Sequence, residues 1–207
     1  AISLEEAYAK SCNVVFAELA LRLQAGRLER AARRLGIGKP AGWRAERLGT
    51  PFGTLRGFAQ LDGEEAGRLF ACGAPPDDPA VLALTGIGQH SVRITPLQAA
   101  QWTAAVAAGG GPLPAPRAVS RVTWKNGREM VRFPVKAHPG TGFSPHAARW
   151  LKKAMRLAAE SGTASRLSGL PGGAAGKTGT AETGNGGLVH QWFTGFYPLE
   201  RPRYAVA

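Results

Sequence analysis

Apolar residues in positions 1–40 recur at the spacing of helices. Ser3 and Glu6 have the spacing of a capping box, which predicts a helix start. Apolar faces lie on either side of a polar turn at 11–13, and they consist of Leu4, Ala7, Tyr8, Val14, Val15, Ala17, Leu19 and Leu21. The pattern predicts a helix, a short break and a second helix. A further helix is expected from about Leu28 to Leu35, because Gly36 then supplies a stop signal.

The middle of the chain mixes irregular and regular patterns. The segment 43–79 is rich in glycine and proline and is interpreted as irregular. Thr95-Pro96 predicts the start of a buried central helix that runs over 97–108. Alternating residues on either side of Asn126-Gly127 predict a hairpin over 118–135. An amphipathic helix is expected over 144–159, with one apolar face made of Trp150, Leu151, Ala154 and Leu157.

The period changes near the C-terminal end of the chain. Segments 174–183 and 189–197 are predicted to be strands, and a third begins at Arg203. Helices followed by an antiparallel sheet indicate an α+β fold. We expect one domain over 1–207, with a mainly helical part at 1–170, an inserted hairpin near 117–135, and the sheet at 171–207.

The formal net charge is +12 and the isoelectric point is about 10.7. Such a charge suits nucleic acid, an anionic membrane surface or an acidic polymer, and charge alone does not choose among them. The arginines are scattered, and no zinc-finger spacing, RNP-type aromatic motif or heptad-backed basic region is present. We therefore expect no nucleic-acid partner.

Cysteine and histidine patterns give no support for a metal or redox site. Cys12 and Cys72 form no CxxC pair, and His90, His138, His146 and His190 lack the spacing of metal ligands. No cofactor and no metal are predicted. No apolar run approaches the roughly 18 to 20 residues of a membrane span, so the fragment itself is expected to be soluble.

The stretch 176–182, Gly-Lys-Thr-Gly-Thr-Ala-Glu, is compatible with two kinds of binding site. A phosphate-binding Walker A loop needs a glycine where Pro171 stands, and a helix after Lys177-Thr178, where the pattern predicts a strand. The alternative is a Lys-Thr-Gly element on a sheet edge. There a cation and hydroxyls hold a substrate carboxylate, and the glycine lets the substrate approach the strand closely.

Further motifs accompany Lys177-Thr178-Gly179 in a fixed order. Ser11-Cys12-Asn13 matches a Ser-x-Asn element at a helix–helix turn, and the remaining blocks are Gly86-Ile-Gly-Gln89, Thr95-Pro-Leu-Gln98 and Gln191-Trp-Phe-Thr-Gly-Phe-Tyr-Pro198. Together the five blocks resemble the transpeptidase domain of penicillin-binding proteins, of class B type. The resemblance covers essentially the whole chain and implies a β-lactamase/transpeptidase-like fold.

The family's acylating serine lies in Ser-x-x-Lys, and none of the serines in this chain has a lysine three residues later. The family places that motif upstream of Ser-x-Asn. The resemblance therefore implies that the N-terminal Ser-x-x-Lys segment and the C-terminal end are missing. It also predicts an exposed, partly unsupported sheet, and no turnover by this chain alone.

The resemblance implies a peptidoglycan D,D-transpeptidase that forms a serine acyl-enzyme with D-alanyl-D-alanine stem peptides and with β-lactams. Ser11, Asn13, Lys177 and Thr180 would then be catalytic. Thr178, Gly179, Thr180 and Ala181 would bind substrate. Other cell-wall synthesis proteins are expected partners, and the intact protein is expected on the outer face of the bacterial cytoplasmic membrane.

Two alternatives stay open. One is a β-lactam sensor or serine β-lactamase of the same fold, which the Thr95-Pro-Leu-Gln98 block and Trp192-Phe-Thr-Gly195 disfavour. The other is a catalytically dead binding or scaffold domain that keeps the cleft and lacks the serine.

Overall fold

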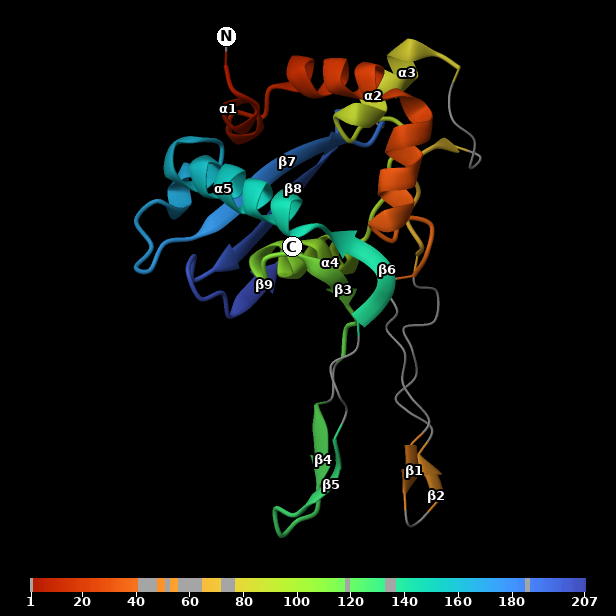
Figure 1. The fold of residues 1–207 in the computed structure, drawn as a ribbon, viewed down its shortest axis with the longest axis vertical. Helices are drawn as coiled ribbons and strands as arrows, with labels where there is room; N and C mark the ends of the chain where they lie inside the picture. Colours follow the sequence, from red (N-terminus) through yellow and green to blue (C-terminus); the bar gives the residue numbers. More distant parts are fainter. Residues whose placement is uncertain are drawn as a thin grey trace.

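The computed structural model describes residues 2–40, 48–50, 53–55, 65–71, 77–117, 120–132, 137–184 and 187–207. Helices gather around a three-stranded antiparallel sheet (Figure 1). The predicted α+β fold is confirmed. Among the described residues, no helix is both long enough and apolar enough to cross a membrane.

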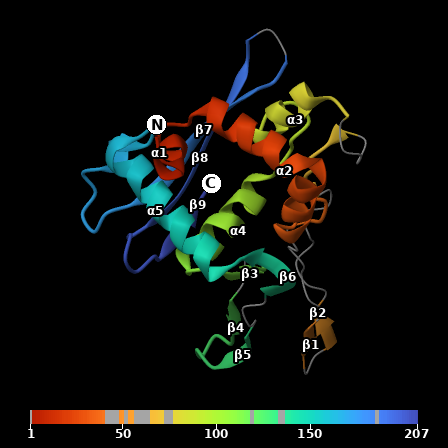
Figure 2. The same ribbon diagram turned by 45° about the horizontal axis from the view of Figure 1, so that its top comes forward.

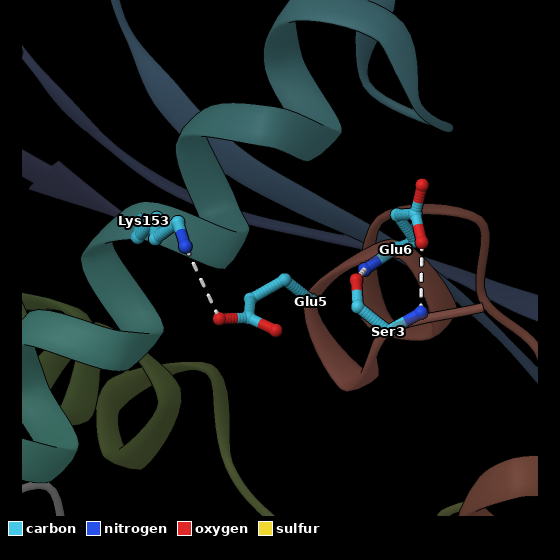
Figure 3. A network of polar contacts seen from close by, with 4 residues as sticks. All are labelled: Ser3, Glu5, Glu6 and Lys153. Carbon is cyan, nitrogen blue, oxygen red and sulfur yellow. Dashed lines mark hydrogen bonds and ion pairs between the residues drawn. The ribbon is translucent and has the colours of Figure 1, made fainter.

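Helix α1 spans Leu4–Ala9 and begins at the predicted capping box. The Ser3 backbone N–H donates to the Glu6 carboxylate at 2.7 Å, and the Glu6 N–H donates to the Ser3 hydroxyl at 3.2 Å (Figure 3). The same helix reaches α5, because Lys153 Nζ lies 3.3 Å from Glu5 Oε1. These contacts fix α1, which carries the turn at Ser11.

Helix α2 spans Asn13–Arg34, so the predicted break between two helices is confirmed. The separate helix expected from Leu28 to Leu35 is instead the second part of α2. Gln24 has a φ of 64° and divides the helix at a kink, after which the ribbon changes direction (Figure 1). The kink involves a single residue and no proline, so no local signal in the sequence showed that the two predicted helices form one kinked helix.

The segment interpreted as irregular contains regular elements. Strands β1 (Leu48–Thr50) and β2 (Gly53–Leu55) pair as an antiparallel hairpin, and helix α3 spans Pro79–Gly86. The interpretation was therefore wrong at β1 and β2, whereas α3 begins at the last residue of the segment and was not predicted; 43–47, 51–52, 56–64 and 72–76 lie outside the described residues. The missed helix had a local signal, since Asp78 caps it by accepting a hydrogen bond from the Ala80 N–H at 2.8 Å.

Helix α4 spans Pro96–Ala107 and is the expected buried central helix. Thr95 and Gln98 form a capping box at its start. The helix contacts α5 and strands of the main sheet, and it crosses the middle of the molecule in Figure 2. Its position makes it the support on which the other layers pack.

After α4 the chain forms two successive strand pairs. Strand β3 (Gly111–Pro114) pairs with β6 (Ala137–Phe143), and neither was predicted. Between them, β4 (Arg121–Thr123) and β5 (Glu129–Arg132) form the predicted hairpin. Its expected ends at 118–119 and 133–135 lie outside the described residues.

Helix α5 spans Pro145–Ser161 with Ser144 as its N-cap, so the helix predicted over 144–159 is confirmed. Its buried residues are Ala148, Ala154, Met155, Ala158 and Ala159. The expected face was therefore only partly right, since Trp150, Leu151 and Leu157 are half-buried and Ala154 is fully buried. Small alanine side chains define the inner face because they let the helix approach its neighbours closely.

The main sheet has the order β7-β8-β9, with β7 at Ala175–Glu182, β8 at Val189–Tyr197 and β9 at Tyr204–Val206. The three predicted strands are confirmed. The core between this sheet and helices α4 and α5 is formed by Val106, Met155, Ala175, Phe196 and Leu199. At the β9 edge, 60% of Tyr204 and 48% of Val206 are exposed, as expected for an uncovered sheet edge.

Candidate active site

A cleft of about 960 Å³ lies along strand β7. Its walls come from the α1–α2 turn, from the loop that follows α3, and from strands β7 and β8. Every predicted site residue lines it: Ser11, Asn13, Lys177, Thr178, Gly179, Thr180 and Ala181. The fold thus brings together residues that are up to 170 positions apart in the sequence.

Ser11 owes its position to the way α1 ends. Its N–H donates to the Tyr8 carbonyl at 3.1 Å, and the Cys12 N–H donates to the Ala7 carbonyl at 2.8 Å. This is the Schellman pattern, in which the residue after the C-cap takes a left-handed conformation that usually belongs to glycine. Ser11 has a φ of 57°, which costs a non-glycine residue of order 1 kcal/mol. The strained turn directs the hydroxyl into the cleft.

Lys177 is the centre of the polar network on β7. Its Nζ donates to Ser11 Oγ at 2.7 Å, to the Thr178 carbonyl at 2.6 Å and to Thr163 Oγ1 at 3.3 Å. The contact with Ser11 joins the helical part of the chain to the sheet. The three acceptors hold the ammonium group in one place at the base of the cleft.

The aromatic ring of Tyr8 lies beside this ammonium group, with Nζ 5.9 Å from the ring centroid. Tyr8 itself makes edge-to-face contacts with Phe16 and Trp150. Burial lowers the pKa of Lys177 from its ordinary value of 10.5, and burial raises the pKa of Tyr8 to about 12. The Tyr8 hydroxyl therefore stays protonated, and the only charge of the pair is that of Lys177.

Thr163 connects two residues of the Lys-Thr-Gly element. Its hydroxyl lies 2.7 Å from Thr178 Oγ1 and 3.3 Å from Lys177 Nζ. Its backbone N–H donates to the Ala9 carbonyl at 3.1 Å, so the end of α5 is fixed against the end of α1. Thr163 is thus a positioning residue for both side chains.

Sequence reasoning missed Tyr8, Thr163 and Gln89 as parts of the site. Tyr8 was assigned only to an apolar helix face, and no motif marks Thr163. Gln89 belongs to a block that supported the resemblance, but it received no role. The Gln89 amide contacts Thr180 and Glu182 on β7, and only the tertiary structure reveals this.

Within the described ranges, no group of three or more His, Cys, Asp and Glu side chains is placed to hold a metal ion. The polar groups that line the cleft are the ammonium group of Lys177, several hydroxyls, the amides of Asn13, Gln89 and Gln191, and the side chains of Arg93, Glu182 and His190. This set binds anionic and amide groups.

The family model of the penicillin binding protein transpeptidase domain matches residues 1–207. The chain belongs to the penicillin-binding protein transpeptidase family. Its α+β fold and the order of its motifs are those that the family resemblance implies.

Curated relatives and solved structures agree with this assignment. Peptidoglycan D,D-transpeptidase PbpA of Mycobacterium tuberculosis (strain CDC 1551 / Oshkosh) is 32% identical over 218 residues, which cover 100% of this chain and 38% of the relative. Penicillin-binding protein A from M. tuberculosis, in a ceftriaxone acyl-enzyme complex, has a TM-score of 0.75 and 29% identity, covering 99% of this chain and 42% of that structure.

A complex between PBP2 and MreC from Helicobacter pylori has a TM-score of 0.71 and 24% identity, covering 99% of this chain and 35% of that one, and it shows the fold alone. These relatives and structures are penicillin-binding proteins of the class B type that the motifs indicated. The chain spans well under half the length of the relatives it matches.

Proposed function

We propose that this transpeptidase chain supplies the ligand-binding side of a D,D-transpeptidase active site. The intact enzyme would attack the D-alanyl-D-alanine end of a peptidoglycan stem peptide through a serine and pass the acyl group to a neighbouring stem. β-Lactams would acylate the same serine. One observation carries the proposal: Lys177 and Ser11, 166 residues apart in sequence, are in direct hydrogen-bond contact within a cleft.

The polar network suits recognition of a carboxylate. Lys177 provides positive charge, and the hydroxyls of Thr178 and Thr180 lie along the same strand. Charge-assisted hydrogen bonds of this kind are about twice as strong as neutral ones. Both the stem peptide and a β-lactam carry the carboxylate that such a site would hold.

The backbone of β7 supports the remaining roles. A Cβ atom on Gly179 would meet Trp192 at an ordinary 3.5 Å, so internal packing does not require glycine at this position. We assign the glycine to close approach by the ligand. The Thr180 N–H would supply one donor of an oxyanion hole, Ala181 would line the ligand, and Asn13 would hold the acyl amide from the opposite wall.

Ser11 would act in proton transfer. Its hydroxyl accepts a hydrogen bond from Lys177 Nζ, which leaves its own proton free to be donated towards a leaving nitrogen. A lowered pKa makes Lys177 a better proton donor than an ordinary lysine. The pair would thus relay a proton to the leaving group.

The first prediction concerns covalent chemistry. The 207-residue chain incubated with a fluorescent penicillin should give no stable adduct, because none of its serines has a lysine three residues later. Denaturing gel fluorescence measures this, with a known penicillin-binding protein as the positive control. A stable adduct on this chain would overturn the division of roles proposed here.

A second prediction concerns Thr163. Thr163→Val should lower the pKa of Lys177 further and cost about 1 kcal/mol of unfolding free energy, since a hydroxyl that accepts from the ammonium is lost. NMR titration of the lysine side chain and urea denaturation measure the two effects. Thr123→Val, on the exposed strand β4, is the matched control and should change neither. An unchanged Lys177 titration would remove Thr163 from the network.

Membership of the family also leads us to propose the location of the intact protein, which is the outer face of the bacterial cytoplasmic membrane, with other cell-wall synthesis proteins as partners.

The division of the chain as a single domain, with its sheet at 171–207, remains part of this proposal. A chromogenic cephalosporin tests the alternative, because rapid hydrolysis by the intact protein would favour a β-lactamase over a transpeptidase.

A further inference from the structure

The edge of β7 that faces the cleft is contacted by the side chain of Gln89. Among the residues that the structure describes, strand β7 pairs only with β8, so alternate backbone groups on its other side point towards the cleft. These groups belong to Thr178, Thr180 and Glu182. A free strand edge of this kind can bind an extended peptide by strand addition.

The side-chain amide of Gln89 already uses two of these groups. Its Nε2 donates to the Thr180 carbonyl at 3.0 Å, and its Oε1 accepts from the Glu182 N–H at 3.2 Å. A carboxamide carries the same donor and acceptor as a peptide group. Gln89 therefore occupies the edge in the manner of one residue of an added parallel strand.

The loop around Gln89 is built to hold this position. Its backbone N–H donates to the Leu84 carbonyl at 3.0 Å, which ties the loop to the end of α3. Gly88 and His90 on either side both have left-handed φ values, of 79° and 61°. A non-glycine residue in this region is strained, and such strain gathers at functional positions.

A second carbonyl on this edge is also taken, since Lys177 Nζ donates to the Thr178 carbonyl. Among the described residues, the Thr180 N–H is left without a hydrogen-bond partner on this edge. An incoming acyl amide that is to donate to the Thr180 carbonyl must therefore displace Gln89 from that carbonyl.

We propose that Gln89 is a latch on the ligand-binding edge, displaced when an amide N–H of the ligand pairs with the Thr180 carbonyl. The latch affects only ligands with such an amide, because they break the Gln89 hydrogen bond when they bind, whereas a ligand without the amide leaves Gln89 in place. It rests on the proposed function, since it assumes that acyl amides of stem peptides or β-lactams bind along β7. Gln89 is thus a specificity-determining residue.

Gln89→Met tests the latch, because methionine keeps the length of the side chain and removes the amide. The 207-residue chain, unchanged and with this substitution, is titrated with benzylpenicillin and with penicillanic acid, and backbone amide shifts of β7 are followed by NMR. Penicillanic acid has the same fused ring and carboxylate but no acyl amide. We expect the variant to bind benzylpenicillin about fivefold more tightly, the equivalent of one net hydrogen bond, and penicillanic acid unchanged.

The outcomes separate the two proposals. No gain for benzylpenicillin, or an equal gain for both ligands, would overturn the latch while leaving the proposed function intact. No binding of either ligand by either form would overturn the proposed function and the latch with it. Gln89→Asn, whose shorter amide cannot span both groups on β7, is the second variant and should show the same selective gain.

Discussion

Replacing Lys177 with methionine should weaken binding of a peptide that ends in D-alanyl-D-alanine by about 10- to 100-fold, because the positive charge that attracts the ligand carboxylate is lost. The substitution keeps the aliphatic stem beside Tyr8 and removes only the ammonium group. Isothermal calorimetry or NMR titration measures the affinity. Lys125→Met, on the exposed β4–β5 turn, removes the same charge far from the cleft and should leave binding within about twofold.

The lowered pKa of Lys177 predicts that ligand affinity depends on pH. The protonated form of Lys177 attracts the ligand carboxylate, and burial lowers the pKa of this lysine below its ordinary value of 10.5. Affinity should therefore be steady near neutral pH and fall as the pH rises through this lowered pKa, earlier than an exposed lysine would allow. Lys177→Arg keeps its charge throughout this window, so its affinity should not fall there. An unchanged Lys177→Met affinity, or the same pH profile for both cations, would contradict the assigned role.

Local signals in the sequence were enough for most elements. The capping pairs Ser3–Glu6 and Thr95–Gln98 depend on residues three positions apart, so they can be recognised without the fold. The three strands of the main sheet follow from their alternation and their turns. The kink at Gln24 and the pairing of β3 with β6 were missed because neither has a distinctive local composition.

The residues of the candidate site were likewise predicted only in part. Ser11-Cys12-Asn13 and Lys177-Thr178-Gly179 were selected by resemblance, and the structure places both on one cleft. Their direct contact depends on the approach of the α1–α2 turn to β7, which no spacing in the chain encodes. Thr163 and Gln89 act through tertiary hydrogen bonds to these elements, so their sequence neighbours could not reveal them.

Gly162 lies where the end of α5 packs closely against the end of α1. It is the C-cap of α5, and a Cβ atom there would lie 2.3 Å from the Ala9 carbonyl oxygen and 2.8 Å from the Ala158 Cα. Both contacts are with main-chain atoms, which cannot rotate away. The Ala9 carbonyl is also held by the Thr163 N–H. An added methyl group must therefore push α1 and the end of α5 apart.

Gly162→Ala should lower the free energy of unfolding by about 2 to 4 kcal/mol, as overpacking against a fixed backbone does. For a chain of this size the midpoint of thermal unfolding should fall by about 5 to 10 °C. Urea and thermal denaturation, followed by circular dichroism, measure both quantities. The folded fraction should also bind ligand more weakly, because α1 carries Ser11 and the end of α5 carries Thr163.

Gly169→Ala is the matched control for this effect. It lies in the same connection between α5 and β7, and a Cβ atom there would meet nothing within 4 Å. Its unfolding free energy should stay within about 0.5 kcal/mol of the unchanged chain. If the two alanine variants were equally stable, the backbone contact between α1 and α5 would not be what brings Ser11 to Lys177, and the positioning of the site would need another cause. A loss confined to Gly162→Ala would locate that cause at the junction of the two helices.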